Sequence, residues 1–498
     1  MEMENEKRID EGYAPQDVDR RVSVHAAPLD ATPKTRWQRT WPTIACGAGL
    51  FSDGYLNGVI GSVNTILKLL YKDEYTKSDA QNNVSSIAFA GTVVGQLIFG
   101  YLSDHWSRRN SLLISTLILI VFAALGAGSY GAGGSIQGMF AALTAYRFLL
   151  GIGIGGEYPA GSVACAEATG ELKRGHRNRW FIASTNLAID LGFVVASIVP
   201  MILVLIFSEH HLRAVWRMCL GLGVIPPLSL LWLRIKLREP EEYNRNKMNH
   251  YPYWLIVKFY WFRLAVVALI WFIYDFSSYS FGIYSSSWLA FLLPSDAPLW
   301  KTFGWNTVIN IFYCPGALFG AFLSDWIGPK YCLVVGVWLQ AIIGFVMTAL
   351  YGHLDKGSQV GGFVVIYGIF LALGEVGPGD NIGLIASKTS ATSVRGQYYG
   401  IAAACGKIGA FVGNYVFPDI IAAAGSNVIK QGQYPFYVSS ALCVFSGFIA
   451  LFCLPNIGQD TITDEDERFR KYLIDHGYDV STLGTKEFHE AKALDNGA

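Results

Sequence analysis

Apolar segments alternate with short polar stretches along most of the chain, from about residue 41 to residue 454. These segments are about 20 residues long or longer, the length that an α-helix needs to cross the hydrocarbon core of a bilayer. The pattern therefore predicts twelve membrane-spanning helices, near residues 41–71, 84–103, 111–130, 138–168, 180–208, 214–235, 262–293, 304–324, 331–352, 361–387, 397–423 and 435–454.

The polar stretches between and around these segments predict the domain organisation. Residues 1–40 are charge-rich and have no apolar core, which indicates a disordered tail rather than a cleaved signal peptide. One substantial interior loop, 236–261, separates two six-helix groups, 41–235 and 262–454. Residues 455–498 form a second tail, with a short helix expected over its acidic stretch. We therefore expect an all-α membrane protein built from two six-helix bundles.

Composition and charge fit this class of protein. The chain is 52% hydrophobic and only 15% charged. Its net charge of zero argues against a nucleic-acid partner. The eight cysteines lie in or next to apolar segments without metal-ligand spacing, which indicates packing residues. The predicted spans carry no Ser/His/Asp set and no metal cluster, so we expect neither an enzyme nor a cofactor.

Lysine and arginine are concentrated on one side of the predicted bundle. They occur in the loop 105–110, in the loop 171–179 and in the central loop, whereas the loops of the opposite side hold fewer of them. Because cytoplasmic loops of membrane proteins carry an excess of Lys and Arg, both termini and the central loop are expected to be cytoplasmic.

The charged side chains inside predicted spans include Asp53, Glu157, Asp275 and Lys407. A charge at bilayer depth costs several kcal/mol unless it faces a partner or water, so these residues are functional candidates. Acids and a base in different spans indicate a polar cavity within the bundle, and therefore a transporter. Lys407 is a point charge that suits an anion, or else a structural counter-ion for Asp275. Asp53 is a candidate proton carrier, or else a helix cap.

Two local patterns place further polar groups on a cavity wall. Trp271, Asp275 and Tyr279 are spaced i, i+4 and i+8, so they stack on one face of a helix. In the fourth span, Pro159 follows Glu157 and Tyr158, and a proline bend is tolerated at membrane depth where it lines a cavity. We therefore expect both patterns to face the interior of the bundle.

An internal repeat relates the two halves of the chain. Aligning the LSD tripeptides that end the second and eighth spans puts Asp104 on Asp325 and Arg109 on Lys330. This repeated loop, together with Arg147 at the head of a glycine-rich fourth span, resembles the signature of the major facilitator superfamily. The resemblance implies that these five residues act in gating, as an inter-helix latch on the cytoplasmic face. The alternative is that the loop charges only orient the helices.

The intramembrane residues also resemble the phosphate:proton symporter branch of that superfamily. The shared pattern is an acid in the first span, acid-Tyr-Pro in the fourth, Trp-x3-Asp-x3-Tyr in the seventh and Gly-Lys-x-Gly in the eleventh. The chain departs from the branch at Glu157, where an aspartate is typical. The resemblance implies that proton coupling runs through Asp53 and Glu157. It also implies a phosphate site formed by Tyr158, Trp271, Asp275, Tyr279 and Lys407.

The tenth span, the segment FSDGYLNGVIGS and the tail segment FRKYLIDHGY look like those of the fungal glycerophosphodiester permeases. This resemblance implies proton-coupled import of glycerophosphocholine or glycerophosphoinositol across the plasma membrane by a monomer. The sequence leaves the head group open, and an inorganic phosphate:proton symporter and a sensor without transport remain alternatives. For Asp190 and Glu375, inter-helix hydrogen bonding is an equal alternative to head-group binding. The head-group candidates are Asn186, Asp190, Glu375, Asp380 and Asn381.

Overall fold

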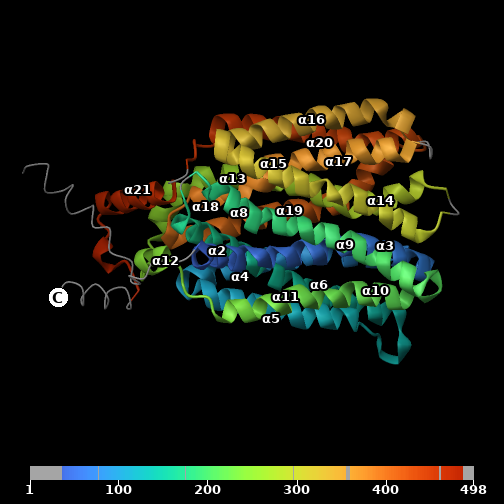
Figure 1. Ribbon diagram of the computed structural model, residues 1–498, viewed down its shortest axis with the longest axis horizontal. Coiled ribbons are helices and arrows are strands. Elements are labelled where there is room, and N and C mark those ends of the chain that lie inside the picture. Colours follow the sequence, from blue (N-terminus) through green and yellow to red (C-terminus); the bar gives the residue numbers. More distant parts are fainter. Residues whose placement is uncertain are drawn as a thin grey trace, which may run out of the picture.

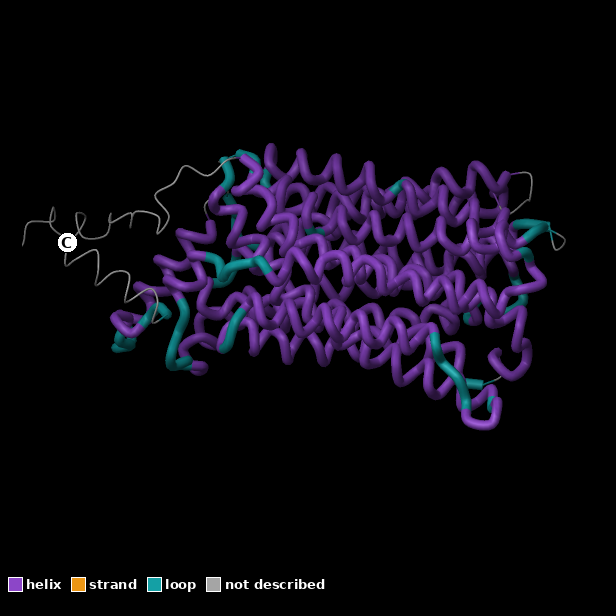
Figure 2. Tube along the Cα trace, turned by 60° about the horizontal axis from the view of Figure 1, so that its bottom comes forward, coloured by secondary structure: helices purple, strands orange, loops and turns teal. Residues whose placement is uncertain are grey.

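The computed structural model describes residues 36–76, 78–173, 175–294, 297–354, 359–458 and 461–485. All regular elements in these ranges are helices (Figure 2). The predicted disordered tail lies outside them, except that the first helix already begins at Arg36. All eight cysteines are free, and five of them are buried, as expected of packing residues.

The first half of the chain forms one bundle (Figure 1). Its fourth span is interrupted at the Glu157–Ser162 segment, which is a turn of π-helix, η3. The helices of this bundle are α2 (Arg36–Gly47), α3 (Phe51–Thr76), α4 (Ala80–His105), α5 (Arg108–Ala127), α6 (Ile136–Gly156), α7 (Val163–Ala168), α8 (Arg177–Ser184), α9 (Asn186–Phe207), α10 (Leu212–Gly221) and α11 (Ile225–Ile235).

The second half forms a matching bundle. Its tenth span is interrupted by another π-helical turn, η8 (Glu375–Gly379), so each bundle has one broken helix at corresponding positions. The helices of this bundle are α13 (Tyr253–Leu292), α14 (Leu299–Ile311), α15 (Tyr313–Ile327), α16 (Pro329–Leu354), α17 (Val360–Gly374), α18 (Asp380–Lys388), α19 (Arg395–Ala422) and α20 (Val428–Cys453).

Eleven helical segments in the described residues are long and apolar enough to cross a membrane. The remaining predicted span is α2 and α3, and α3 is less apolar because it carries polar residues on its buried face. Among them are Ser52, Asp53, Asn57 and Asn64. A span that is polar towards the protein and apolar elsewhere is expected of a helix that lines a polar path.

The predicted central loop, 236–261, contains helical structure. A short helix, α12 (Glu241–Asn246), lies in this loop, and α13 begins at Tyr253, before the end of the predicted loop. The stretch YWLIVKFYW is aromatic and aliphatic and contains no helix breaker, so the helix starts there. The 40 residues of α13 span about 60 Å, twice the hydrocarbon thickness of about 30 Å.

The two bundles meet along pairs of helices related by the internal repeat. Across the interface α4 packs on α19, α3 on α13, α9 on α14 and α8 on α15. Glycine allows the closest approach: a Cβ atom on Gly400 would lie 2.5 Å from the Gln96 carbonyl oxygen of the other bundle. The interface therefore brings the two backbones close together at Gly400.

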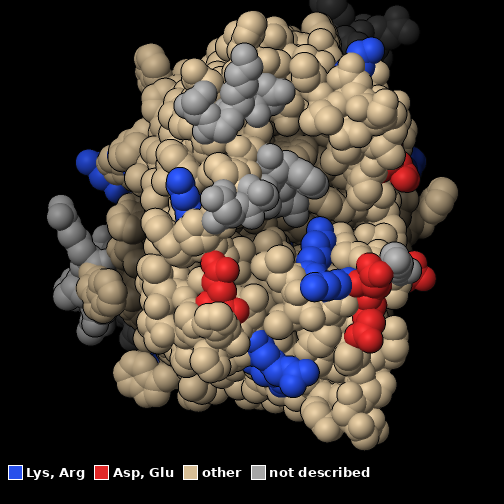
Figure 3. All heavy atoms as spheres, turned by 90° about the vertical axis from the view of Figure 1, so that its right-hand side faces the viewer, with Lys and Arg blue, Asp and Glu red and all other residues tan. Residues whose placement is uncertain are grey.

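One end of the bundle, which we name the latch end, carries α12, the start of α2 and a helix of the C-terminal tail, α21 (Thr461–Asp475) (Figure 1). The predicted short helix of the tail is thereby confirmed. Both ends of the described chain and the central loop share this end, as the Lys and Arg pattern predicts. On the opposite end, charged side chains are scattered over a mainly uncharged surface (Figure 3).

Candidate functional site

A small cavity lies at the centre of the molecule, between the two bundles. Its volume is about 60 Å³, enough for a few water molecules. Asp53 is completely buried beside it and touches two of its lining tyrosines. The polar and aromatic residues that line the cavity come from both bundles: Tyr158, Phe181, Asn186, Asp190, Phe193, Trp271, Tyr274, Asp275, Tyr279, Glu375, Asp380, Tyr399 and Lys407.

The Lys407 ammonium group sits among acids and phenols from three other segments. Its Nζ lies 3.3 Å from Asp275 Oδ2 and 3.7 Å from Asp53 Oδ2, and it donates a hydrogen bond to the Tyr279 hydroxyl. Tyr279 and Tyr158 both donate to Asp53 Oδ2. Because α19 and α13 belong to one bundle and α3 and η3 to the other, this cluster joins the two halves.

Trp271 of α13 lies on one side of this cluster. Its ring packs edge-on against Tyr399 with centroids 5.4 Å apart. A Cβ atom on Gly406 would lie 2.4 Å from the indole, so the glycine before Lys407 lets α19 approach the tryptophan. The glycine therefore places the ammonium beside the Trp271, Asp275 and Tyr279 face that the spacing predicts.

A second group of acids lines the same cavity, and within the described chain no lysine or arginine pairs with them. The Asn186 amide donates to Glu375 Oε2 at 2.9 Å and to Asp380 Oδ1 at 2.8 Å, and Tyr274 donates to Glu375 Oε1 at 2.8 Å. Asp190 is 1% exposed, and both of its carboxylate oxygens lack a hydrogen-bond partner in the described chain. The hydrogen bonding expected as an alternative is thus present for Glu375 and absent for Asp190.

Besides Asp53, two predicted binding or coupling residues lie outside the cavity lining, Asn381 and Glu157. Asn381 donates to the carbonyls of Val376 and Gly377. Its side-chain amide therefore serves the irregular backbone of η8 and is not directed at a ligand. Glu157 forms a buried bidentate pair with Arg234 of α11, at 2.5 and 2.6 Å. The charge of Glu157 is therefore already balanced inside the first bundle.

Arg147, predicted as a gating residue, also lies away from the latch. It sits in the middle of α6 and donates to the carbonyls of Val84 at 2.7 Å and Leu56 at 3.3 Å. These bonds tie α6 to α4 and α3 within one bundle. As the sequence spacing indicates, Arg147 does not pair with Glu157.

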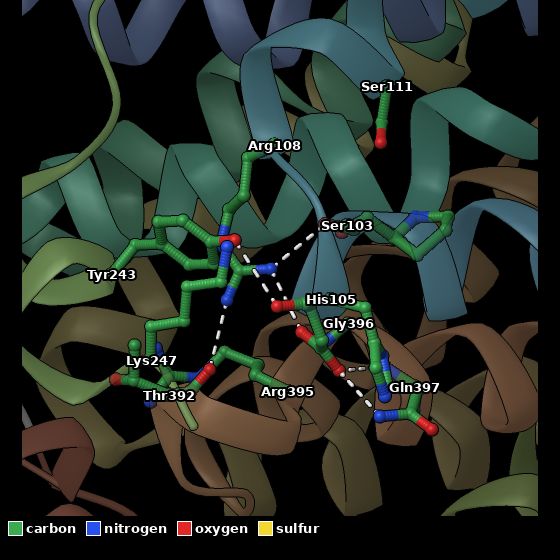
Figure 4. A network of polar contacts seen from close by, with 12 residues as sticks. Ser103, His105, Arg108, Ser111, Tyr243, Lys247, Thr392, Arg395, Gly396 and Gln397 are labelled. Carbon is green, nitrogen blue, oxygen red and sulfur yellow. Dashed lines mark hydrogen bonds and ion pairs between the residues drawn. The ribbon is translucent and has the colours of Figure 1, made fainter. Parts of the chain in front are cut away.

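The latch end closes on Asp104, near the end of α4. Figure 4 shows the surrounding network, with Arg108, Gly396 and Gln397 labelled. The Asp104 carboxylate accepts hydrogen bonds from the backbone amides of Gly396 at 2.9 Å and Gln397 at 2.8 Å, in the first turn of α19. Arg108 Nη1 lies 3.1 Å from the same carboxylate, and Arg108 Nη2 reaches the Thr392 carbonyl at 3.0 Å. A carboxylate at a helix N-terminus is favoured by the free amides and by the helix dipole.

The arginine that contacts Asp104 is Arg108, whereas the resemblance implies Arg109. Arg109 instead donates to the Ile235 carbonyl at 2.7 Å. Arg108 also pairs with Glu167 at 2.8 Å, and Arg395 of the second bundle pairs with the same carboxylate at 3.0 Å. Glu167 is therefore held between one arginine from each bundle, all three being fully buried.

The repeat produces a second contact at the latch end. Asp325 of α15 accepts from Arg179 Nε in α8 at 2.5 Å, and Asn178 donates to the Ser324 carbonyl at 3.2 Å. Each LSD aspartate thus crosses to the start of a helix in the other bundle. Lys330 does not take part in this contact, since it donates to the Leu454 carbonyl at 2.7 Å.

The tail and the central loop cover the latch. Asp466 of α21 accepts from the Thr392 amide at 2.6 Å, and Glu465 pairs with Arg263 at 2.7 Å. In the loop, Tyr243 donates to the Asp104 carbonyl at 3.2 Å. Burial raises the pKa of Asp466 above its ordinary value, although nearby Arg395 opposes the shift.

Sequence reasoning missed several residues of the site: Arg108, Glu167, Arg179, Arg234 and Arg395. All five lie near the ends of predicted spans. Arginine is common there, at the membrane interface, so its presence does not by itself indicate a functional site. The one signal available was Glu167, an acid in an apolar segment, which calls for a buried basic partner.

Comparison with known proteins identifies the family. A family of sugar and other transporters matches residues 41–252 and 240–469. The major glycerophosphoinositol permease GIT3 of Candida albicans is 53% identical over 452 residues, covering 89% of this chain and 84% of that protein. The glycerophosphocholine permease GIT4 of the same species is 52% identical over 457 residues, covering 91% of this chain and 85% of that protein. The chain belongs to the family of the fungal glycerophosphodiester permeases.

This family belongs to the major facilitator superfamily, so the resemblances seen in the sequence are confirmed. The proton:xylose symporter XylE from E. coli shares its fold with a TM-score of 0.71 at 15% identity, covering 87% of this chain and all of that one. The family and these relatives are transporters and permeases, and the chain is a multi-pass membrane transporter rather than an enzyme.

Proposed function

We propose that this permease is a proton-coupled symporter that imports glycerophosphodiesters across the plasma membrane. The observation that carries the proposal is the Lys407 ammonium, buried at the bundle interface and contacted by acids and phenols from both halves. A phosphodiester carries one negative charge, which an ammonium and two phenols can bind. The printed names of GIT3 and GIT4 agree with this substrate class.

The sum of the charges around Lys407 explains why a proton would bind together with the anion. Asp53 and Asp275 together with Lys407 carry a net charge of −1 when all are ionised, and a bound phosphodiester would make it −2. A proton on one of the two aspartates removes this excess, so anion and proton favour each other's binding. Because Glu157 is balanced by Arg234, we assign proton coupling to Asp53 and Asp275 instead. Coupling requires this difference in affinity between states.

In this proposal the two bundles rock about the central site. The latch end faces the cytoplasm, because it carries most of the interior and loop arginines. With the latch closed, the cavity of about 60 Å³ is too small for a glycerophosphodiester. Binding from outside therefore requires the opposite end to separate, and release requires the contacts of Asp104 and Asp325 to break.

Uptake measurements in yeast cells that lack their own uptake of these diesters test the proposal. We expect labelled glycerophosphodiester to accumulate, faster at acidic external pH, and a protonophore to stop the accumulation. Lys407→Ala is expected to lower uptake by about tenfold to a hundredfold, because a charged hydrogen-bond donor is lost. The matched control is Lys430→Ala, which removes an exposed lysine on α20.

Two results would replace this proposal with another function. Strong inhibition of diester uptake by equimolar inorganic phosphate, with phosphate itself accumulating, would favour the phosphate symporter. Binding of the diester by the purified protein without uptake by cells would favour a sensor. Equal uptake by the Lys407→Ala variant and the wild type would remove Lys407 from the site.

A further inference from the structure

The acids on the far wall of the central cavity differ from every other interior acid described above. Asp53 and Asp275 contact Lys407, Glu157 pairs with Arg234, and Glu167 pairs with two arginines. Each buried carboxylate in these sets has a cation beside it. Such pairing is what the cost of burying a charge leads one to expect.

Asp190, Glu375 and Asp380 have no such cation within the described part of the chain. All three are at most 4% exposed and line the cavity. Their bound partners are the neutral groups of Asn186 and Tyr274. Both oxygens of Asp190 and the Oδ2 atom of Asp380 have no hydrogen-bond partner at all. The wall thus presents three carboxyl groups and free acceptor atoms to the cavity.

The lining around these acids narrows the class of cation. Within the described residues, no group of acids, histidines or cysteines is arranged to hold a metal ion. Aromatic side chains line the same cavity, among them Phe193, Trp271 and Tyr274, and the Tyr274 hydroxyl donates to Glu375. A cavity lined by acids and aromatic rings suits an organic ammonium group, which is attracted to ring faces as well as to charge.

We propose that Asp190, Glu375 and Asp380 form a subsite for a cationic head group. This inference rests on the proposed function and specifies its substrate: a zwitterionic glycerophosphodiester whose phosphate meets Lys407 and whose ammonium meets the three acids. A choline head group fits this subsite better than inositol, because a neutral polyol would leave the carboxylates without a counter-charge. Asp190 comes from one bundle and the other two acids from the second, so the head group also bridges the halves.

Competitive uptake of glycerophosphocholine and glycerophosphoinositol tests the subsite. We expect the wild type to prefer the choline diester by about tenfold or more in kcat/KM. Asp190→Asn is expected to reduce kcat/KM for the choline diester by a similar factor and to change that for the inositol diester little. Asp190→Glu, which keeps the charge, should restore part of the preference. Uptake of glycerophosphoethanolamine, whose ammonium carries no methyl groups, tells which property of the head group the subsite recognises. Uptake close to that of the choline diester indicates recognition of the positive charge. Weak uptake indicates recognition of the methylated ammonium.

The isosteric amide removes a charge without creating a cavity, so the variant is expected to fold, and its thermal unfolding in detergent is measured alongside. Asp419→Asn, at an exposed acid on α19, serves as the matched control. An equal preference for the two diesters, a preference for the inositol diester, or an equal loss of both in Asp190→Asn would overturn the subsite. Transport of neither diester by the wild type would instead contradict the proposed function.

Discussion

Lys407 and Arg234 illustrate two uses of a buried cation in this molecule. Lys407 contacts two carboxylates at 3.3 and 3.7 Å, and it is a compact group that can exchange partners. Arg234 holds Glu157 in a bidentate pair at 2.5 and 2.6 Å and also donates to Thr116. A planar guanidinium bound in this way is a fixed structural partner. The first arrangement suits a binding site, and the second suits a bundle that moves as a rigid body.

A structural role for Glu157 predicts a loss of stability in Glu157→Gln. Removing one member of a buried ion pair leaves the Arg234 charge uncompensated, which costs about 3–5 kcal/mol of unfolding free energy. The melting temperature of the purified protein should therefore fall clearly. Arg234→Met combined with Glu157→Met should recover part of this loss. A Glu157→Gln variant that is as stable as the wild type, but has lost its proton dependence, would return Glu157 to the coupling site.

For Asp53 we expect a substitution to abolish proton coupling rather than to lower stability. Asp53→Asn keeps an oxygen that can accept from Tyr158 and Tyr279 but cannot exchange a proton. We expect exchange of labelled for unlabelled diester across proteoliposomes to persist, while accumulation driven by a pH gradient disappears. Undiminished accumulation in this variant would exclude Asp53 as the proton carrier and leave Asp275.

At the level of elements, the latch depends on the contacts between α5, α7 and the start of α19. Arg108→Ala should free the α19 terminus, because Arg108 links Asp104, Glu167 and Thr392. Hydrogen exchange of the first α19 amides should speed up by about tenfold, since hydrogen bonds to charged groups contribute about 1.5–3 kcal/mol. Arg109→Ala is the adjacent control and should leave these amides protected. Equal effects of the two variants would contradict the latch.

The tail helix α21 should dock on the latch in a pH-dependent way. Burial raises the pKa of both Asp466 and Glu465 in the docked tail above the ordinary values of 3.8 and 4.5. Protonation therefore favours docking, and this contribution is present below those values and is lost as the pH rises through the raised ones. Hydrogen exchange in α21, corrected for the intrinsic rate at each pH, should accordingly increase as the pH rises. Exchange that slows instead would show that Arg395 and Arg263 dominate.

The contacts that close the whole molecule at the latch end include two that the internal repeat relates to each other, at Asp104 and at Asp325. If transport requires this end to open, a covalent bridge across it should stop the cycle. Cysteines at Asn178 and Ser324, which are in contact, should form such a bridge on oxidation in a background without the native cysteines. Transport should cease and return on reduction, while each single variant stays insensitive to the oxidant. Continued transport by the bridged protein would rule out opening at this contact.

The sequence predicts the spans and the central charges well, because both follow from the cost of polar groups in lipid. Lys407 and Asp275 stand out in apolar segments, and the i, i+4 spacing puts Asp275 on the face of α13 that lines the cavity. The choice between Arg108 and Arg109 depends instead on how α5 is rotated against α19. Such rotation is set by packing between segments far apart in the chain, and a local pattern does not contain it.

The same limit applies to the start of α13 and to the partner of Glu157. Hydropathy marks apolar segments, whereas the helix α13 begins at Tyr253, within the predicted central loop. The partner of Glu157, Arg234, is 77 residues away in sequence and comes from the last helix of the bundle. Sequence spacing excludes Arg147 as that partner but does not identify Arg234.

The α19 helix carries the capped amides of its first turn and the site lysine on one continuous rod. Gly396 and Lys407 are separated by about 16 Å along such a rod, at 1.5 Å per residue. When a stiff helix of this length tilts, its two ends move together unless one of them is the pivot. If release of the Asp104 carboxylate shifts the ammonium, then cargo bound to the ammonium biases that release to the same extent in free energy. Gate and cargo would then communicate through one helix, without a relay of intervening side chains.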